Sequence, residues 1–152
     1  MTLEILSSDK VQVLEQVKSW REAISIAANP LKEQGYFQQD YIDDMIHSVE
    51  KLGPYIVIAP EIAIAHARPN NNVKKIGLSL LKLNQHINFS EEGHYASLVF
   101  VLSAIDNEGH LEVLRNLAIT LGNQQTVEHL LNAQTSSEII NIFKGEWGQW
   151  KF

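Results

Sequence analysis

The segment YASLVFVLSA, residues 95–104, decides the fold class. Its centre is continuously apolar from Leu98 to Leu102, which is typical of a β-strand covered on both faces. A strand of this kind lies inside a sheet that has a helical layer on each side. The rest of the chain should therefore supply further strands and two sets of helices.

Further short runs predict the other strands. They are β-branched and are bounded by Pro, Asn or Gly: residues 54–59 (PYIVIA), 61–66 (EIAIAH) and 76–83 (IGLSLLKL). The run VQVLEQV, residues 11–17, fits two structures. Val11 and Val13 alternate as in a strand, whereas Val11, Leu14 and Val17 also share one face of a helix.

Helical patterns precede the strands. Ser19 and Glu22 match a capping box, and the helix that they open should stop near Gly35, with Pro30 kinking or interrupting it. A second apolar stripe, with spacings of three and four over residues 41–52, ends at a glycine.

Helical patterns return after the last strand. An apolar face over residues 111–121 predicts one helix, TVEHLLN (126–132) a second, and a capping box at Thr135 a third. We therefore predict a single domain over residues 1–152, with an α/β fold. It should be a three-layer α/β/α sandwich with a central mixed β-sheet. The strand order is not readable from this pattern.

The composition is that of an ordinary globular protein, with 45% hydrophobic and 20% charged residues among 152. No apolar run approaches the roughly 20 residues that cross a bilayer, and the start of the chain lacks the features of a secretion signal. We therefore expect a cytoplasmic protein. The absence of cysteine excludes disulfides, a thiol nucleophile and sulfur-bound zinc. A net charge of −6 with scattered basic residues argues against nucleic-acid binding.

Two of the six histidines have an unusual context. His66 ends a predicted strand, and His110 opens the helix that follows the strand at 95–104. Strand ends in sheets flanked by helices commonly carry functional sites. The remaining histidines lie in predicted helices or in polar loop sequence: His47, His86, His94 and His129.

Two chemistries are open for this pair. With Arg68 and the free N–H groups of a helix start nearby, two imidazoles would form a phosphate site, one as nucleophile and one as hydrogen-bond donor. Equally, His66 and His110 would serve as metal ligands together with Asp106 or Glu108. The chain has no P-loop, no dinucleotide fingerprint and no serine-nucleophile elbow.

Three quoted segments carry a family resemblance: GPYIVIAPEIAIAHARP (53–69), GLSLLKLNQHINF (77–89) and VLSAIDNEGHLEVLRNLA (101–118). Together they resemble the mannitol/fructose-type (type 2) EIIA domain of the bacterial sugar phosphotransferase system, most closely its ascorbate-specific branch. The segment at 19–46 fits the opening helices of that family. The resemblance thus covers most of the chain.

The resemblance implies a phosphohistidine carrier with an α/β/α sandwich fold and no metal or organic cofactor. The histidine that matches His66 accepts a phosphoryl group from the carrier protein HPr and passes it to an EIIB component. EIIB then phosphorylates a sugar or sugar acid that enters through the membrane component EIIC. The histidine that matches His110 helps to hold the phosphoryl group. The sugar cannot be read from the sequence.

Two positions depart from the family pattern. Ala65 stands where the family usually has proline, which would restrict the backbone before the histidine. The arginine that mannitol-type members carry in the preceding helix is missing, so Arg68 is a candidate substitute. Asn107 is a second candidate for a supporting role, although helix capping explains it equally well. An alternative function is a regulatory EIIA-like protein whose phosphorylation state controls a partner.

Overall fold

The computed structural model describes residues 5–67 and 73–147, and within these ranges five strands form one mixed sheet. Their order is β1-β4-β5-β3-β2. The strands are β1 (Val11–Leu14), β2 (Val57–Ala59), β3 (Glu61–Ala65), β4 (Gly77–Asn88) and β5 (Tyr95–Ser103). β1 pairs with β4, and β3 with β5, in parallel, whereas β4–β5 and β2–β3 are antiparallel.

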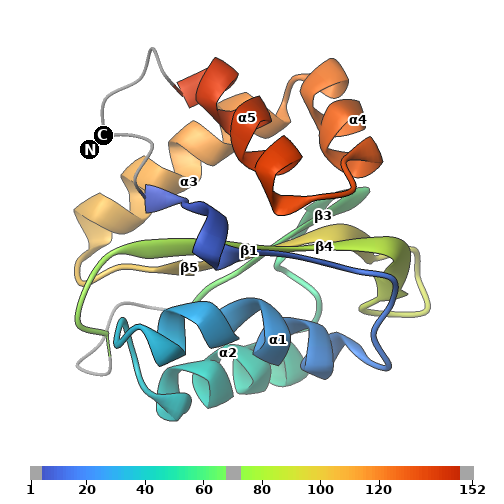
Figure 1. The fold of residues 1–152 in the computed structure, drawn as a ribbon. Helices are drawn as coiled ribbons and strands as arrows, with labels where there is room; N and C mark the ends of the chain where they lie inside the picture. Colours follow the sequence, from blue (N-terminus) through green and yellow to red (C-terminus); the bar gives the residue numbers. More distant parts are fainter. Residues whose placement is uncertain (1–4, 68–72, 148–152) are drawn as a thin grey trace.

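Helices cover both faces of this sheet (Figure 1). On one face lie α1 (Trp20–Glu33) and α2 (Gln39–Leu52). On the other lie α3 (Asn107–Leu121), α4 (Gln124–Asn132) and α5 (Ser136–Trp147). A 3-10 turn, η2 (Ser8–Lys10), precedes β1. This arrangement confirms the predicted α/β/α sandwich with a mixed sheet.

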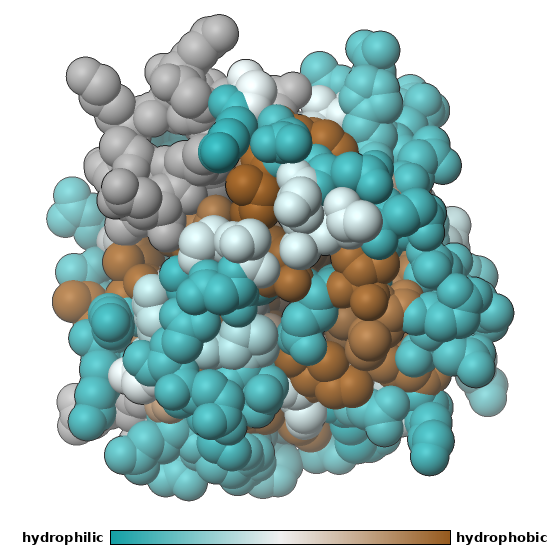
Figure 2. All heavy atoms as spheres, in the orientation of Figure 1, coloured by the Kyte–Doolittle hydropathy of each residue, from teal (hydrophilic) through white to brown (hydrophobic). Residues whose placement is uncertain are grey.

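Strand β5 contributes to two hydrophobic cores, which explains its uninterrupted apolar sequence. Leu98, Phe100 and Leu102 pack beneath α3, α4 and α5, whereas Val99 and Val101 pack against α1 and α2. All five side chains are buried. Figure 2 shows apolar atoms between the two helical layers, whose outer surfaces are mostly hydrophilic. Burial on both faces therefore selects a run without polar residues.

Helix α1 runs through Pro30 to Glu33, so the expected break at Pro30 is wrong. Proline has no N–H to donate to the carbonyl oxygen of Ile26, four residues earlier. The side chain of Gln12, on β1, donates to that oxygen at 2.7 Å and replaces the missing bond. The predicted cap is confirmed, because the Ser19 hydroxyl accepts the N–H of Glu22 at 3.1 Å.

Several boundaries differ from the sequence-based expectation. The ambiguous run at 11–17 contains strand β1, because it pairs with β4. Strand β4 is longer than predicted and includes His86, which we had expected in a loop. Strand β2 is shorter, because it begins only at Val57. The edge position of β2 leaves it a single hydrogen-bonding neighbour, which suits a short strand.

Candidate active site

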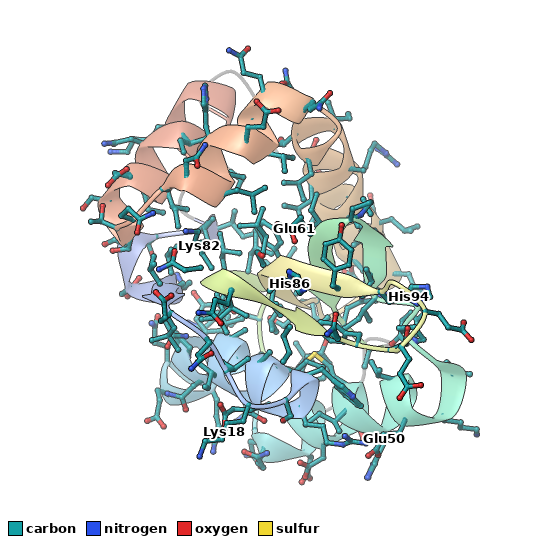
Figure 3. All side chains as sticks on the ribbon, turned by 90° about the vertical axis from the view of Figure 1, so that its right-hand side faces the viewer. Lys18, Glu50, Glu61, Lys82, His86 and His94 are labelled. Atoms are coloured by element: carbon teal, nitrogen blue, oxygen red, sulfur yellow. The ribbon has the colours of Figure 1, made fainter. Side chains whose placement is uncertain are left out.

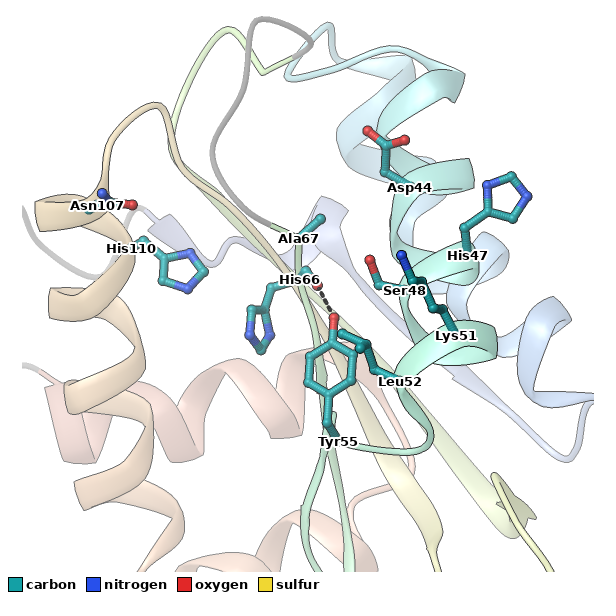
Figure 4. A pocket seen from close by; sticks show the side chains of 10 residues that line it. All are labelled: Asp44, His47, Ser48, Lys51, Leu52, Tyr55, His66, Ala67, Asn107 and His110. Atoms are coloured by element: carbon teal, nitrogen blue, oxygen red, sulfur yellow. Dashed lines mark hydrogen bonds between the residues drawn. The ribbon is translucent and has the colours of Figure 1, made fainter.

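His66 and His110 meet at one edge of the sheet, as the sequence predicted. Strands β3 and β5 are parallel, so their carboxyl ends lie at the same edge. His66 directly follows β3, and His110 lies in the first turn of α3, which begins shortly after β5. The two rings are 5.0 Å apart between centroids and inclined at 63°. Figure 4 shows both side chains.

A hydrogen bond fixes the proton on the His66 ring. Its Nδ1 lies 2.8 Å from the carbonyl oxygen of Ile64. A carbonyl oxygen only accepts, so Nδ1 carries the hydrogen and donates it. In the neutral ring, Nε2 then has a free lone pair. The local chain therefore presents Nε2 of His66 as a nucleophile.

His110 is partly buried in a setting that favours its uncharged form. Burial, and secondly the charge of His66, lower the pKa of His110 below the ordinary value for histidine. Its Nδ1 is buried and has no hydrogen-bond partner among the described residues. A proton on Nδ1 would be a buried donor without an acceptor, whereas a proton on Nε2 can be donated into the cavity. The favoured tautomer is thus an Nε2–H donor.

The start of α3 is capped by its own residues. The carboxylate of Asp106 accepts the N–H of Gly109 at 2.7 Å, and the backbone carbonyl oxygen of Asp106 accepts the N–H of His110 at 3.2 Å. The backbone donors of these two residues are therefore engaged, and our expectation of free N–H groups does not hold for them. Asn107, by contrast, lines the cavity beside the histidines.

A cavity of about 670 Å³ opens in front of the two histidines. Its far wall is formed by α2 and by the segment that follows it (Figure 4). The lining residues are Asp44, His47, Ser48, Lys51, Leu52, Tyr55, His66, Ala67, Asn107 and His110.

The sequence reasoning missed this far wall. Asp44, Ser48 and Lys51 recur at helical spacing along one side of the apolar stripe of α2. That spacing identifies a shared polar face, but it does not tell which part of the sheet the face overlooks. Among the described residues, Lys51 contributes a lysine side chain to the cavity lining. Arg68, our predicted supporting residue, lies outside the described residues.

The backbone beside His66 is bonded to two tyrosines. The hydroxyl of Tyr55 donates to the carbonyl oxygen of His66 at 2.9 Å. The N–H of Ala67 donates to the hydroxyl of Tyr41 at 3.2 Å. The ring of Tyr55 also meets the His66 ring edge-on, with centroids 5.7 Å apart. Sequence patterns carried no signal for these contacts, because they join residues that are far apart in the chain.

Of the other histidines, His47 lines the same cavity from α2, whereas His86 and His94 make their contacts elsewhere. His86 packs against the ring of Tyr95 at 4.8 Å, and Nδ1 of His94 lies 2.7 Å from the hydroxyl of Ser90. Both belong to the β4–β5 hairpin region labelled in Figure 3. Within residues 5–67 and 73–147, no group of three or more His, Asp or Glu side chains is arranged to hold a metal ion.

Comparison with known proteins identifies the family. The family described as "Phosphoenolpyruvate-dependent sugar phosphotransferase system, EIIA 2" matches residues 4–146. The chain belongs to this family, so the resemblance seen in the sequence is confirmed. It is thus an EIIA component of the sugar phosphotransferase system, a phosphotransferase that carries its phosphoryl group on histidine.

Individual relatives agree with this assignment. The mannitol-specific cryptic phosphotransferase enzyme IIA component of Escherichia coli (strain K12) is 31% identical over 132 residues, which are 87% of this chain and 90% of the relative. The ascorbate-specific EIIA component of Salmonella typhimurium is 26% identical over 140 residues, 91% of each chain. Relatives of both the mannitol-specific and the ascorbate-specific kinds are therefore found.

Solved structures agree as well. The structure of mannitol enzyme IIA in complex with phosphorylated enzyme IIB from Escherichia coli superposes with a TM-score of 0.81 and 25% identity. The match covers 91% of this chain and 96% of that one. No helix in the described ranges is long and apolar enough to cross a membrane.

Proposed function

We propose that Nε2 of His66 accepts a phosphoryl group from the phosphohistidine of HPr and passes it to an EIIB component. The phosphoryl group would then reach a sugar or sugar acid that enters through the membrane component EIIC. Ascorbate and mannitol are candidates, because relatives of both kinds exist. Since phosphoenolpyruvate supplies the phosphoryl group in this family, we assign the reaction to the cytoplasm.

One observation carries this proposal. The bond from His66 Nδ1 to the Ile64 carbonyl leaves Nε2 free, and the partner histidine lies 5.0 Å away between ring centroids. A nucleophile with a fixed tautomer beside a neutral hydrogen-bond donor suits phosphoryl transfer, which depends mainly on positioning and electrostatics.

The phosphoryl transfer forms one N–P bond and breaks another. The Nε2 lone pair of His66 attacks phosphorus, the N–P bond of HPr breaks, and its electron pair returns to the HPr imidazole. The Nδ1 proton of His66 stays on the ring, held by the Ile64 carbonyl, so the phosphorylated ring carries a positive charge. Such a ring leaves as neutral imidazole when the next acceptor attacks, which keeps onward transfer easy.

The cavity lining would stabilise the transferring group. The Nε2–H of His110 and the ammonium of Lys51 are candidate donors to the equatorial phosphoryl oxygens. Asn107 lies on the same lining and stays a candidate for a supporting role. Arg68 also stays a candidate, from the sequence alone.

The test is incubation with enzyme I, HPr and phosphoenolpyruvate, followed by intact mass and mapping of the modified histidine. We expect one added phosphoryl group on His66 and none in His66→Ala. The matched control, His86→Ala, should be phosphorylated like the natural protein. Phosphate on another histidine, or none on a folded protein beside an active control EIIA, would refute the assignment.

Onward transfer separates a carrier from a regulatory switch. The phosphorylated protein should lose its phosphoryl group to mannitol- or ascorbate-type EIIB domains, and His110→Ala should slow this step while phosphorylation stays detectable. Transfer at an unchanged rate would refute the role of His110. A phosphorylated protein that donates to neither type would instead support the regulatory alternative.

A further inference from the structure

A single peptide group beside the phosphorylation site is held from both sides. The carbonyl oxygen of His66 accepts a hydrogen bond from the hydroxyl of Tyr55 at 2.9 Å. The N–H of Ala67, the other end of the same peptide, donates to the hydroxyl of Tyr41 at 3.2 Å. Because a peptide group is planar, two bonds at its opposite ends restrain its orientation.

Tyr41 ties this peptide to the neighbouring strand. Its side chain is only 1% exposed, and its hydroxyl donates to the carbonyl oxygen of Leu102 on β5 at 2.7 Å. The hydroxyl thus donates to β5 and accepts from the segment that follows β3. Burial raises the pKa of Tyr41 to about 12, so the hydroxyl keeps its proton near neutral pH.

Tyr55 reaches the peptide from the opposite side. It follows α2, lines the cavity and is 40% exposed. Burial raises the pKa of the Tyr55 hydroxyl, and a hydrogen bond with Ser48 lowers this pKa by a smaller amount. Tyr55 therefore remains a donor, and its ring packs edge-on against the His66 ring.

Within the described residues, strand pairing stops short of this peptide. The pairing of β3 with β5 ends at Ala65 and Val101, one residue before His66. Neither Ala65 nor Ala67 fixes its own φ angle as proline does. Yet in-line transfer needs Nε2 placed to within about 0.5 Å of its productive position. Something else must hold the backbone of the nucleophile.

We infer that Tyr41 and Tyr55 are positioning residues that clamp the His66–Ala67 peptide and so aim Nε2 of His66 at the phosphoryl donor. The inference rests on the proposed function of His66. Tyr41 sets the peptide relative to β5, and Tyr55 sets it relative to the cavity wall. Both act through the backbone and the ring orientation, not through contact with the phosphoryl group.

The test uses Tyr→Phe variants, which keep the rings and remove only the hydroxyls. Tyr55→Phe and Tyr41→Phe should each lower the maximal rate of phosphorylation by HPr about tenfold, because a small displacement of a reacting atom is costly. The HPr concentration at half-maximal rate should not change. Tyr95→Phe, at the start of β5 beside His86, is the matched control and should keep the natural rate.

The double variant gives a sharper outcome. Both hydroxyls hold the same peptide, so the combined loss should be smaller than the product of the two single losses. If Tyr41→Phe does not fold, the more exposed Tyr55 carries the kinetic test alone. A natural rate in Tyr55→Phe, measured on a folded protein, would overturn the inference.

Nuclear magnetic resonance separates this inference from the proposed function. For the natural protein, the clamp predicts one set of ¹⁵N signals for the His66 ring and a slowly exchanging Nδ1–H. In the Phe variants, the ring signals should broaden or the Nδ1–H should exchange faster. This readout needs no phosphoryl transfer, so it stands even if the natural protein is not phosphorylated on His66. Unchanged Nδ1–H exchange in both variants would refute the clamp.

Discussion

At the residue scale, the chemistry depends on which ring nitrogen is free. The Ile64 carbonyl holds the proton on Nδ1 of His66, and burial lowers the pKa of the neighbouring His110. Neither effect needs an acidic partner, because a backbone carbonyl sets the tautomer of His66 and burial lowers the pKa of His110. The phosphoryl oxygens also call for a positive charge, and Lys51, which lines the opposite wall of the cavity, is the candidate we propose for it.

This placement predicts the effect of removing that charge. Lys51→Met keeps the length of the side chain but loses one charge-assisted hydrogen bond, worth ~1.5 kcal/mol in the transition state. Phosphorylation by HPr should therefore slow by about tenfold, measured by single-turnover kinetics. Lys18→Met, which changes net charge equally outside the cavity lining, should have little effect. Equal slowing in both variants would point to general electrostatic attraction instead.

At the element scale, strand β1 supplies a hydrogen bond that helix α1 lacks. Pro30 leaves the carbonyl oxygen of Ile26 without its helical donor, and Gln12 on β1 supplies one at 2.7 Å. The hydroxyl of Ser79 on β4 also bonds into α1, at the Ala27 carbonyl, 2.6 Å away. The Gln12 bond replaces the donor that Pro30 removes, and both bonds tie the continuous helix α1 to the sheet.

The Gln12 bond predicts coupling between two distant positions. Gln12→Leu should lower the free energy of unfolding by about 1–2 kcal/mol, because it leaves the Ile26 carbonyl unpaired. In a Pro30→Ala background, the helix supplies its own N–H, and the same Gln12→Leu change should cost clearly less. Urea denaturation of the four proteins measures this coupling. Gln16→Leu, an exposed position past β1, is the control, and additive effects would contradict this role of Gln12.

At the scale of the whole molecule, the active site links stability to pH. His110 is partly buried at the sheet edge beside His66, with its Nδ1 atom shielded from solvent. Its pKa is lower in the folded state than in the unfolded chain. The unfolded chain therefore binds more protons in the interval between the two pKa values, and stability rises with pH across it.

The expected consequence is loss of stability on acidification. The contribution of His110 should be fully present above the unfolded pKa of about 6.5 and should decline as the pH falls through the lowered folded pKa. His110→Gln, which does not titrate, should remove this part of the pH dependence. Thermal unfolding between pH 5 and 8 provides the comparison. Parallel curves for the two proteins would show that His110 contributes nothing.

Much of this protein follows from local sequence. Helix starts at Ser19 and Thr135 follow from capping chemistry, and the central strand follows from its continuous apolar run. His66 and His110 were predictable as a pair because each occupies the end or the start of an element at a sheet edge. These features depend on neighbours within a few residues, which sequence patterns record directly.

The tertiary structure alone decided the rest. The order β1-β4-β5-β3-β2, the wall of α2 across the cavity and the tyrosine clamp all join residues far apart in the chain. The ambiguous run at 11–17 contains a strand only because β4 offers a free edge to pair with. Such choices follow from packing and long-range hydrogen bonding. No local pattern carries them, because the energies that select them exist only in the assembled sheet.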